Sequence, residues 1–161
     1  MTINAGERLP DASLTTIGAD GPEPVRLHDR LAGRKIVLFA LPGAYTRGCT
    51  ATHMPSFVRS ADAFREKGVD EIVCLAVNDP FVLNAWGHDT GAHDAGITLL
   101  ADAEGSFTRA VGMEFSAPAI GLIGRSNRYA LVAEDGIVTS VMIDEPGACS
   151  LSTGESLLAT I

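Results

Sequence analysis

Apolar runs of strand length alternate with segments of helical periodicity from about residue 35 onward. Residues 35–41 and 71–77 hold nearly unbroken apolar stretches, which predict strands buried on both faces of a sheet. Between them, apolar side chains recur at helical spacing over residues 54–64, and Gly68 stands where a helix C-cap would lie. This alternation of strands and helices predicts an α/β layered fold.

The alternation continues into the middle of the chain. Asp79 followed by Pro80 predicts the start of a helix, because aspartate is a frequent N-cap and proline fits the first helical position. Residues 97–101 are a third strand candidate, and residues 107–111 predict a short helix that ends at Gly112.

The last third of the chain changes character. Residues 129–133 and 137–143 flank the segment Glu134-Asp-Gly136, which is a strong signal for a β-hairpin. Antiparallel strands are therefore expected to join the parallel ones in a central mixed sheet flanked by helices. Ser152 and Glu155 have the spacing of a capping box, which predicts a closing helix.

The length of 161 residues suits one substantial core, and no repeat or low-complexity linker divides the chain. We therefore expect a single domain over residues 1–161, with turns and short strands in residues 1–34. A net charge of -8 without a basic run argues against nucleic acid or an anionic membrane as partner. The longest apolar run, residues 36–41, is too short to span a bilayer.

The N-terminus shows no secretory signal, and by default this predicts a cytoplasmic protein. Three cysteines are too few and too widely spaced for the disulfide framework of a small secreted domain. In a reducing compartment they matter as thiols.

Cys49 lies between the first buried strand and the amphipathic helix, at or just before a helix N-terminus. Unpaired backbone amides and the helix dipole stabilise an anion there, which predicts a nucleophilic thiolate. Thr46 could donate to the sulfur or accept from a bound hydroxyl. Arg47 and, if the fold brings it near, Arg128 would add positive charge. The alternative is that Thr46 caps the helix and Cys49 is a buried apolar side chain.

The segment Pro42-Gly-Ala-Tyr-Thr46-Arg-Gly-Cys49, followed by Thr52-His-Met-Pro55, resembles the active-site segment of the peroxiredoxins. Further segments are similar to the peroxiredoxin 5, or type II, branch and occur in that family's order: Val77-Asn-Asp-Pro-Phe-Val82, Trp86-Gly87, Leu99-Leu-Ala-Asp102, Arg128-Tyr129 and Asp135-Gly-Ile-Val138. The resemblance covers nearly the whole chain. It implies a thioredoxin-like fold and a peroxidase without cofactor or metal, which reduces hydrogen peroxide and alkyl hydroperoxides and so serves oxidative-stress defence.

The resemblance also implies roles for individual residues. Cys49 is the peroxidatic cysteine, which attacks the O–O bond and becomes a sulfenic acid. Thr46 would orient the peroxide, and Pro42 would shield the sulfur from bulk water. Arg128 would stabilise the thiolate and the charge that develops on the peroxide oxygens. Arg47 stands where this branch commonly has proline, so we expect a more positive rim and a less rigid loop.

Two further thiols bear on how the sulfenic acid is reduced. Cys149 lies in a loop of small residues, where we expect it to be exposed and movable, and it resembles the resolving cysteine of animal enzymes of this branch. The flanking loop is shorter here, so a resolving and an idle role both stay open. Cys74 lies inside an apolar strand and is expected to be part of the core. If neither thiol resolves, the resemblance implies direct reduction by glutathione, glutaredoxin or thioredoxin, and it also implies a homodimer.

His53 follows Cys49 by four residues and could share a helix face with it. A cysteine–histidine pair or a metal site would need further groups that the sequence does not bring together, so a local hydrogen-bonding role is expected. Two other functions remain as alternatives to a peroxidase. One is a peroxide sensor that passes oxidation to a partner, and the other is a non-catalytic interaction protein in which Cys49 is inert.

Overall fold

The computed structural model describes residues 2–161, and within that range the strands form a seven-stranded sheet and a separate two-stranded one. The order in the larger sheet is β2-β1-β5-β4-β3-β8-β9. Its centre consists of the parallel strands β3 (Lys35–Ala40), β4 (Glu71–Ala76) and β5 (Thr98–Ala101). Strand β8 (Tyr129–Glu134) runs antiparallel to β3, and β9 (Ile137–Ile143) antiparallel to β8. The expected mixed sheet is confirmed.

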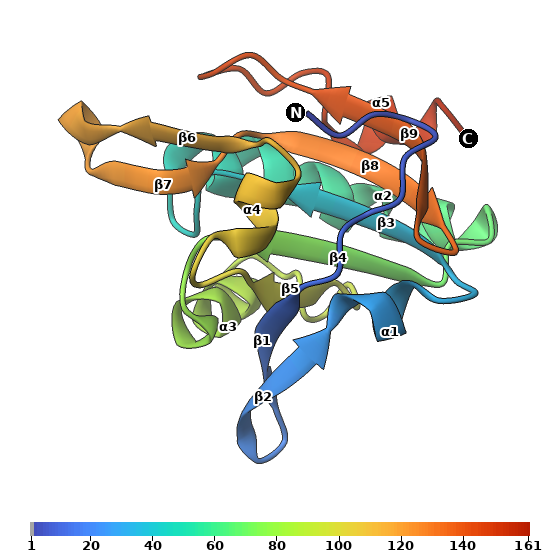
Figure 1. Ribbon diagram of the computed structural model, residues 1–161, viewed down its shortest axis with the longest axis horizontal. Helices are drawn as coiled ribbons and strands as arrows, with labels where there is room; N and C mark the ends of the chain where they lie inside the picture. Colours follow the sequence, from blue (N-terminus) through green and yellow to red (C-terminus); the bar gives the residue numbers. More distant parts are fainter. Residues whose placement is uncertain (1) are drawn as a thin grey trace.

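Helices cover both faces of this sheet (Figure 1). One face packs against α2 (Met54–Glu66), α3 (Pro80–Asp89) and α5 (Gly154–Leu158), and the other against α1 (Leu27–Leu31) and α4 (Ser106–Ala110). Alternate residues of the central strands point into the two cores, which explains why their apolar runs are unbroken.

Two hairpins extend the structure. Strands β1 (Ser13–Gly18) and β2 (Gly21–Arg26) join one edge of the large sheet through an antiparallel contact between β1 and β5. Strands β6 (Glu114–Ala117) and β7 (Leu122–Ser126), connected through the 3-10 helix η2 (Pro118–Ile120), form the small sheet, which projects from the body at the left of Figure 1. The sequence did not predict β6, β7 or the short helix α1.

The helix starts follow the expected caps in one case and differ in another. The Asp79 carboxylate accepts from the amide of Val82, as an N-cap should. The cap of α5 is Thr153 and not Ser152, so the predicted capping box is wrong by one residue. The physical reason is that the hydroxyl of Ser152 is buried and donates to Asp144 instead.

None of the helices in residues 2–161 combines the length and the apolar character that a membrane crossing needs.

Candidate active site

Cys49 lies in the first turns of the helical segment that follows β3. The backbone is helical from Arg47, passes through the π-helical turn η1 (Cys49–His53) and continues as α2. In this turn the amide of Met54 donates to the carbonyl of Cys49, five residues earlier. The thiol is fully buried near the positive end of the helix, where an anion is stabilised.

Arg128 brings a positive charge to this sulfur. It immediately precedes β8, whose first residue Tyr129 pairs with Ala40 at the end of β3, so the arginine lies beside the loop that leads to Cys49. Its Nη2 donates to the Cys49 Sγ at 3.4 Å, and its Nε donates to the carbonyl of Ala148 at 3.1 Å. The third nitrogen, Nη1, is buried and has no acceptor among residues 2–161. A permanently charged guanidinium therefore touches the sulfur and keeps a free donor.

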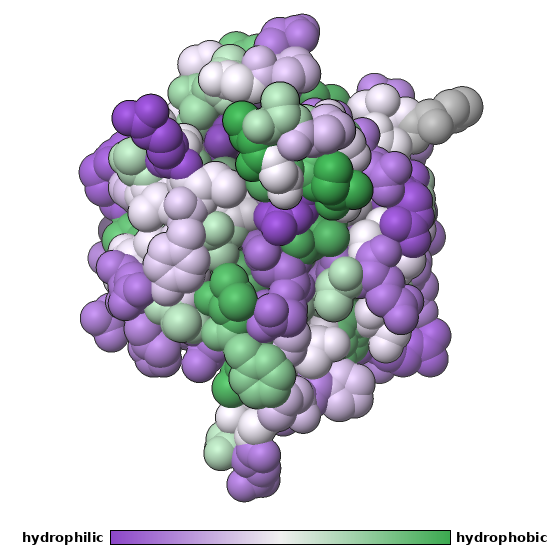
Figure 2. Space-filling view, turned by 90° about the vertical axis from the view of Figure 1, so that its left-hand side faces the viewer, coloured by the Kyte–Doolittle hydropathy of each residue, from purple (hydrophilic) through white to green (hydrophobic). Residues whose placement is uncertain are grey.

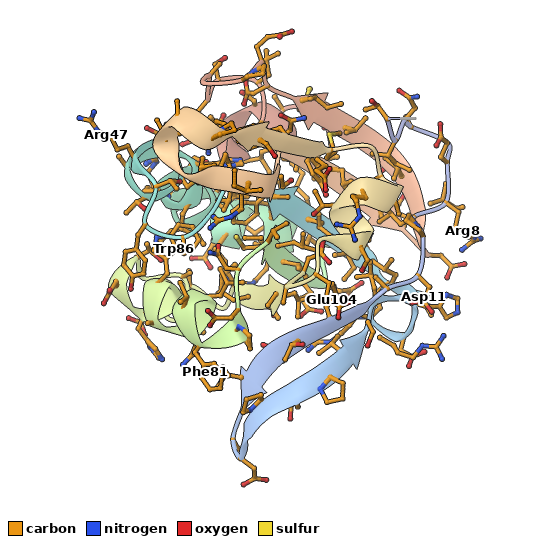
Figure 3. The ribbon with its side chains drawn as sticks, turned by 60° about the vertical axis from the view of Figure 1, so that its left-hand side comes forward. Arg8, Asp11, Arg47, Phe81, Trp86 and Glu104 are labelled. Atoms are coloured by element: carbon orange, nitrogen blue, oxygen red, sulfur yellow. The ribbon has the colours of Figure 1, made fainter. Side chains whose placement is uncertain are left out.

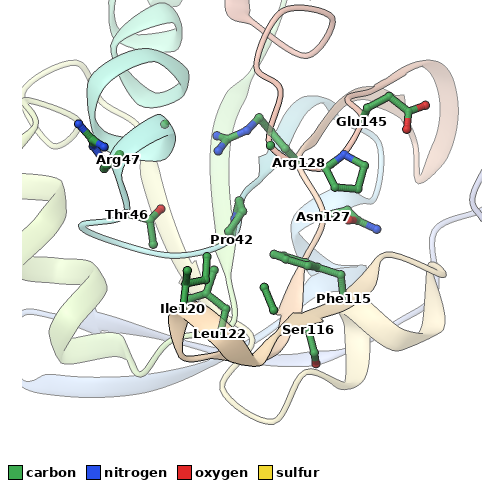
Figure 4. Close-up of a pocket in the computed structure, with 14 residues that line it drawn as sticks. Pro42, Thr46, Arg47, Phe115, Ser116, Ile120, Leu122, Asn127, Arg128 and Glu145 are labelled. Atoms are coloured by element: carbon green, nitrogen blue, oxygen red, sulfur yellow. The ribbon is translucent and has the colours of Figure 1, made fainter.

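A cavity of about 590 Å³ opens beside these groups (Figure 4). Pro42, Thr46 and Arg128 form one side of it. The β6–β7 hairpin supplies an apolar wall opposite, and the residues of that wall are Phe115, Ala117, Ile120 and Leu122. Gly48 also lines the cavity, and a Cβ on it would lie 2.9 Å from the Arg128 Nη2. Glycine at this position thus lets the guanidinium approach the sulfur.

The hydroxyl of Thr46 uses its proton within the loop. Its Oγ1 donates to the carbonyl of Gly43 at 2.8 Å, which leaves its lone pairs free to accept a hydrogen bond. Arg47 contributes to the mouth of the cavity, but its guanidinium projects outward to the surface (Figure 3). The expected positive rim is therefore a solvated charge at the mouth and not a group inside the cavity.

His53 is neutral at physiological pH. Burial first, and then the nearby Arg128, lower its pKa to about 3. Its Nε2 lies 2.9 Å from the carbonyl oxygen of Ser152, so this nitrogen carries the proton and donates. The ring thus joins η1 to the segment before α5, which is the local hydrogen-bonding role expected for it. Within the described range there is no group of three or more His, Cys, Asp or Glu residues suited to a metal ion.

The loop that carries Cys149 is held by a buried carboxylate. Asp144 accepts hydrogen bonds from the amides of Ser150, Leu151 and Ser152 at 3.1, 2.8 and 3.0 Å. Cys149 is half-buried and not exposed as expected, because this loop folds back toward Arg128. Burial raises the pKa of the Cys149 thiol, and the charge of Arg128 acts against that rise.

Cys74 is a core residue, as predicted. It is fully buried on β4 opposite Phe39 of β3, and burial raises the pKa of its thiol well above the usual value.

Two residues of this region were missed by the sequence reasoning. The Nη1 of Arg125 donates to the carbonyl of Pro42 at 3.1 Å, and the Oδ1 of Asn78 accepts from the amide of Ala44 at 2.9 Å. Asn78 lies within a segment already noted for its resemblance, and Arg125 is three residues before Arg128. The sequence positions of Asn78 and Arg125 do not indicate that their side chains bind backbone atoms of the same loop.

Comparisons with known proteins agree with one another. A family model described as Redoxin matches residues 4–156. Peroxiredoxin-2E-2, chloroplastic, of Oryza sativa subsp. japonica is 44% identical over 164 residues, which cover 99% of this chain and 73% of that protein. Reduced Prx3 in complex with H2O2 from Vibrio vulnificus superposes with a TM-score of 0.92 at 37% identity, over 99% of this chain and 96% of the other. Peroxiredoxin 5 from Alvinella pompejana superposes with a TM-score of 0.84 at 36% identity, over 98% of this chain and 97% of the other.

One expectation is corrected by these comparisons. The assignment to the cytoplasm was a default, and it is wrong, because the rice relative is named as a chloroplastic protein.

Proposed function

Because this chain belongs to the peroxiredoxins of the type II branch and is a thiol peroxidase with a thioredoxin-like fold, we propose that Cys49 is its peroxidatic cysteine. Thr46, Arg128 and Pro42 would complete the site around it. The match of the family model to residues 4–156 supports the further proposal that residues 1–161 form one domain.

The contact between Arg128 and Cys49 carries this proposal. An Nη2–Sγ distance of 3.4 Å puts a full positive charge against the sulfur in a buried place, where electrostatic interactions are strong. The thiolate is the reactive form of cysteine, so a group that favours it makes the sulfur a nucleophile.

The surrounding groups support a defined course for the reaction. The Cys49 thiolate attacks the terminal oxygen of the hydroperoxide, the O–O bond breaks, and the sulfur becomes a sulfenic acid. The other oxygen leaves with the electron pair and takes up a proton to form water or an alcohol. Thr46 would accept a hydrogen bond from the peroxide hydroxyl, and the free Nη1 of Arg128 would donate to the oxygen that gains charge. Pro42 would limit access of bulk water.

A thiol reductant then returns the sulfenic acid to the thiol, and two routes remain open for it. The half-buried Cys149 would attack the sulfenic sulfur and form a disulfide with release of water. The influence of Arg128 on this thiol supports its nearness to the site. Alternatively, glutathione, glutaredoxin or thioredoxin would attack directly through the cavity. Nonreducing peptide mapping after one equivalent of peroxide distinguishes the routes, since a Cys49–Cys149 disulfide is the product of the first alone.

We also propose a homodimer that uses the face around the cavity mouth. Tyr45, Phe81 and Ile120 expose 53%, 64% and 73% of their surface, and Ile120 lines the cavity. Figure 2 shows apolar patches among polar ones on the face that lies at the left of Figure 1. Phe81 lies on the outer side of α3 (Figure 3). Burial of such side chains favours association. The mass of the wild type from light scattering should be twice that of one chain, and the mass of Phe81→Glu should be smaller. A monomeric wild type would contradict the dimer.

Substitution of the nucleophile tests the catalytic proposal directly. Cys49→Ser should abolish peroxide consumption in the presence of a thiol donor, whereas Cys74→Ala should retain it. Intact-mass analysis with a sulfenic-acid trap should show one adduct on the wild type after mild peroxide and none on Cys49→Ser. Turnover by Cys49→Ser would refute the assignment. A wild type without any adduct at Cys49 would favour the non-catalytic alternative.

A further inference from the structure

The loop between β3 and η1 has an unusual backbone. Tyr45 has a φ of 65°, in the left-handed region that residues other than glycine rarely occupy, and Gly43 has a φ of 154°. A non-glycine residue in the left-handed region is strained, and this conformation persists only where neighbouring groups hold it. This strained loop carries Pro42 and Thr46 toward the cavity, so whatever holds it also sets where these two residues meet a peroxide.

Arg125 holds the loop from the β7 side. Its Nη1 donates to the Pro42 carbonyl at 3.1 Å, and a Cβ on Gly43 would lie only 2.3 Å from the same nitrogen. The guanidinium is therefore packed directly against the glycine. Among residues 2–161 no carboxylate forms an ion pair with Arg125. The half-buried guanidinium of Arg125 is therefore bound by the loop backbone, through the Pro42 carbonyl.

Asn78 holds the loop from the other side. It follows β4, and its Oδ1 accepts from the Ala44 amide at 2.9 Å. The same oxygen would lie 3.3 Å from a Cβ on Gly43, so Asn78 and Arg125 close around one glycine. Two side chains, one on β7 and one just after β4, thereby fix consecutive peptide groups of the loop.

We propose that Arg125 and Asn78 are positioning residues of the peroxidase reaction. They hold the strained loop so that Thr46 and Pro42 meet the peroxide at the Cys49 sulfur. The inference rests on the proposed roles of Thr46 and Cys49. Neither positioning residue touches the sulfur, in contrast to Arg128.

Because Arg125 and Asn78 contact the loop and not the sulfur, their loss should affect two reactions of the Cys49 thiol differently. Attack on a peroxide needs the O–O bond aligned by the loop, whereas alkylation by iodoacetamide needs only an accessible thiolate. Loss of Arg125 or Asn78 should therefore slow the first reaction selectively. A general loss of folded structure would change both rates together.

The chain contains its own optical probe for the measurement. Trp86 is the single tryptophan in the sequence, and its Nε1 donates to the Thr50 hydroxyl at 3.1 Å, next to Cys49. Stopped-flow fluorescence can follow oxidation by hydrogen peroxide. Arg125→Ala and Asn78→Ala should each lower the second-order rate constant about 10- to 100-fold, as a misaligned reactant does. Alkylation should stay within about threefold, because Arg128 still favours the thiolate.

Matched variants control for general effects. The Nη1 of Arg8 also donates to a backbone carbonyl, that of Asp135 at 3.2 Å, but Arg8 lies on the opposite side of the molecule from Arg47 (Figure 3), so Arg8→Ala should leave both rates unchanged. Asn78→Asp keeps an acceptor for the Ala44 amide and should react nearly as the wild type. Added guanidinium ion at millimolar concentration should restore part of the peroxide rate in Arg125→Ala and leave the rate of Arg8→Ala unchanged.

The results that overturn the inference are distinct from those that overturn the proposed function. Unchanged peroxide rates in Arg125→Ala and Asn78→Ala, or equal losses in both reactions, would remove the positioning role while the wild type still consumes peroxide. A wild type in which Cys49 is not oxidised would instead remove the proposed function. If Arg125→Ala does not fold, Asn78→Ala compared with Asn78→Asp decides the matter alone.

Discussion

Replacement of Asp144 by alanine should weaken both the fold and the active site. The carboxylate is 4% exposed and accepts from the amides of Ser150, Leu151 and Ser152. The loop that it holds contains Ala148, whose carbonyl is the acceptor for the Nε of Arg128. One buried carboxylate therefore supports the arginine that touches the Cys49 sulfur.

The geometry sets the size of the effect on stability. A hydrogen bond from an amide to a charged acceptor contributes on the order of 1 kcal/mol or more, so three such bonds represent about 3 kcal/mol. Water can replace the carboxylate at the exposed Ser150 and Leu151, which reduces the expected loss to about 2 kcal/mol. For a chain of this length the melting temperature should fall by about 4–8 °C.

The same carboxylate gives a defined pH dependence. Burial acts to raise the pKa of Asp144, but hydrogen bonds from the Ser152 hydroxyl and from the loop amides outweigh it, so the pKa lies below 3.8. A carboxyl with a lowered pKa in the folded protein stabilises it fully above the unfolded-state pKa, and that contribution is lost as the pH falls through the folded-state value. The contribution should therefore begin to fall below about pH 4 and be lost once the pH is below the folded-state pKa, and Asp144→Asn should lack it.

Urea unfolding at pH 7, with Trp86 fluorescence as the signal, tests the stability change. Asp20→Ala, which alters an exposed aspartate, should stay within about 0.5 kcal/mol of the wild type. Oxidation of Asp144→Ala by hydrogen peroxide should be about tenfold slower, because Arg128 loses its anchor. Wild-type stability or a wild-type oxidation rate in Asp144→Ala would refute this account of the loop.

Three further predictions concern buried groups. Between pH 6.5 and about 3 the unfolded chain binds a proton on His53 and the folded protein does not, so the free energy of unfolding should decrease as the pH is lowered through that window. His53→Gln should flatten this decrease in urea titrations. The Tyr129 hydroxyl is buried without a hydrogen-bond partner in the described chain, so Tyr129→Phe should raise the free energy of unfolding by about 1 kcal/mol; a loss of stability would contradict this. Cys74→Ala should keep peroxidase activity but cost about 1–2 kcal/mol of stability in the same urea assay.

The sequence predicted those elements whose side chains are all used for packing. The strands β3 and β4 have apolar residues that alternate between two cores, so their apolar runs report the burial directly. The hairpin of β6 and β7 was missed for the opposite reason. Its apolar residues line a cavity or face solvent, and Ile120 is 73% exposed, so no buried pattern marks the segment.

The candidate site was predictable only where its residues share one segment or a recognisable motif. Thr46 and Cys49 are three positions apart, so local spacing suffices to associate them. The role of Arg128 came from the family resemblance, because 79 residues separate it from the sulfur that it contacts. Arg125 and Asn78 gave no such signal, since their partners are peptide groups, which every residue has. The half-buried state of Cys149 likewise depends on the long-range folding of its loop.

The π-helical turn η1 has a consequence for the direction of the sulfur. A π turn contains one residue more than an α turn, and here that extra residue lies between Cys49 and the part of α2 that packs on the sheet. Deletion of one residue from Thr50–Thr52 would allow a regular α-helix, with Phe57 and Phe64 still in the core. It would also turn Cys49 by about 100° about the helix axis, away from Arg128. The direction of the sulfur can thus change by a whole residue step while α2 keeps its packing on the sheet through Phe57 and Phe64.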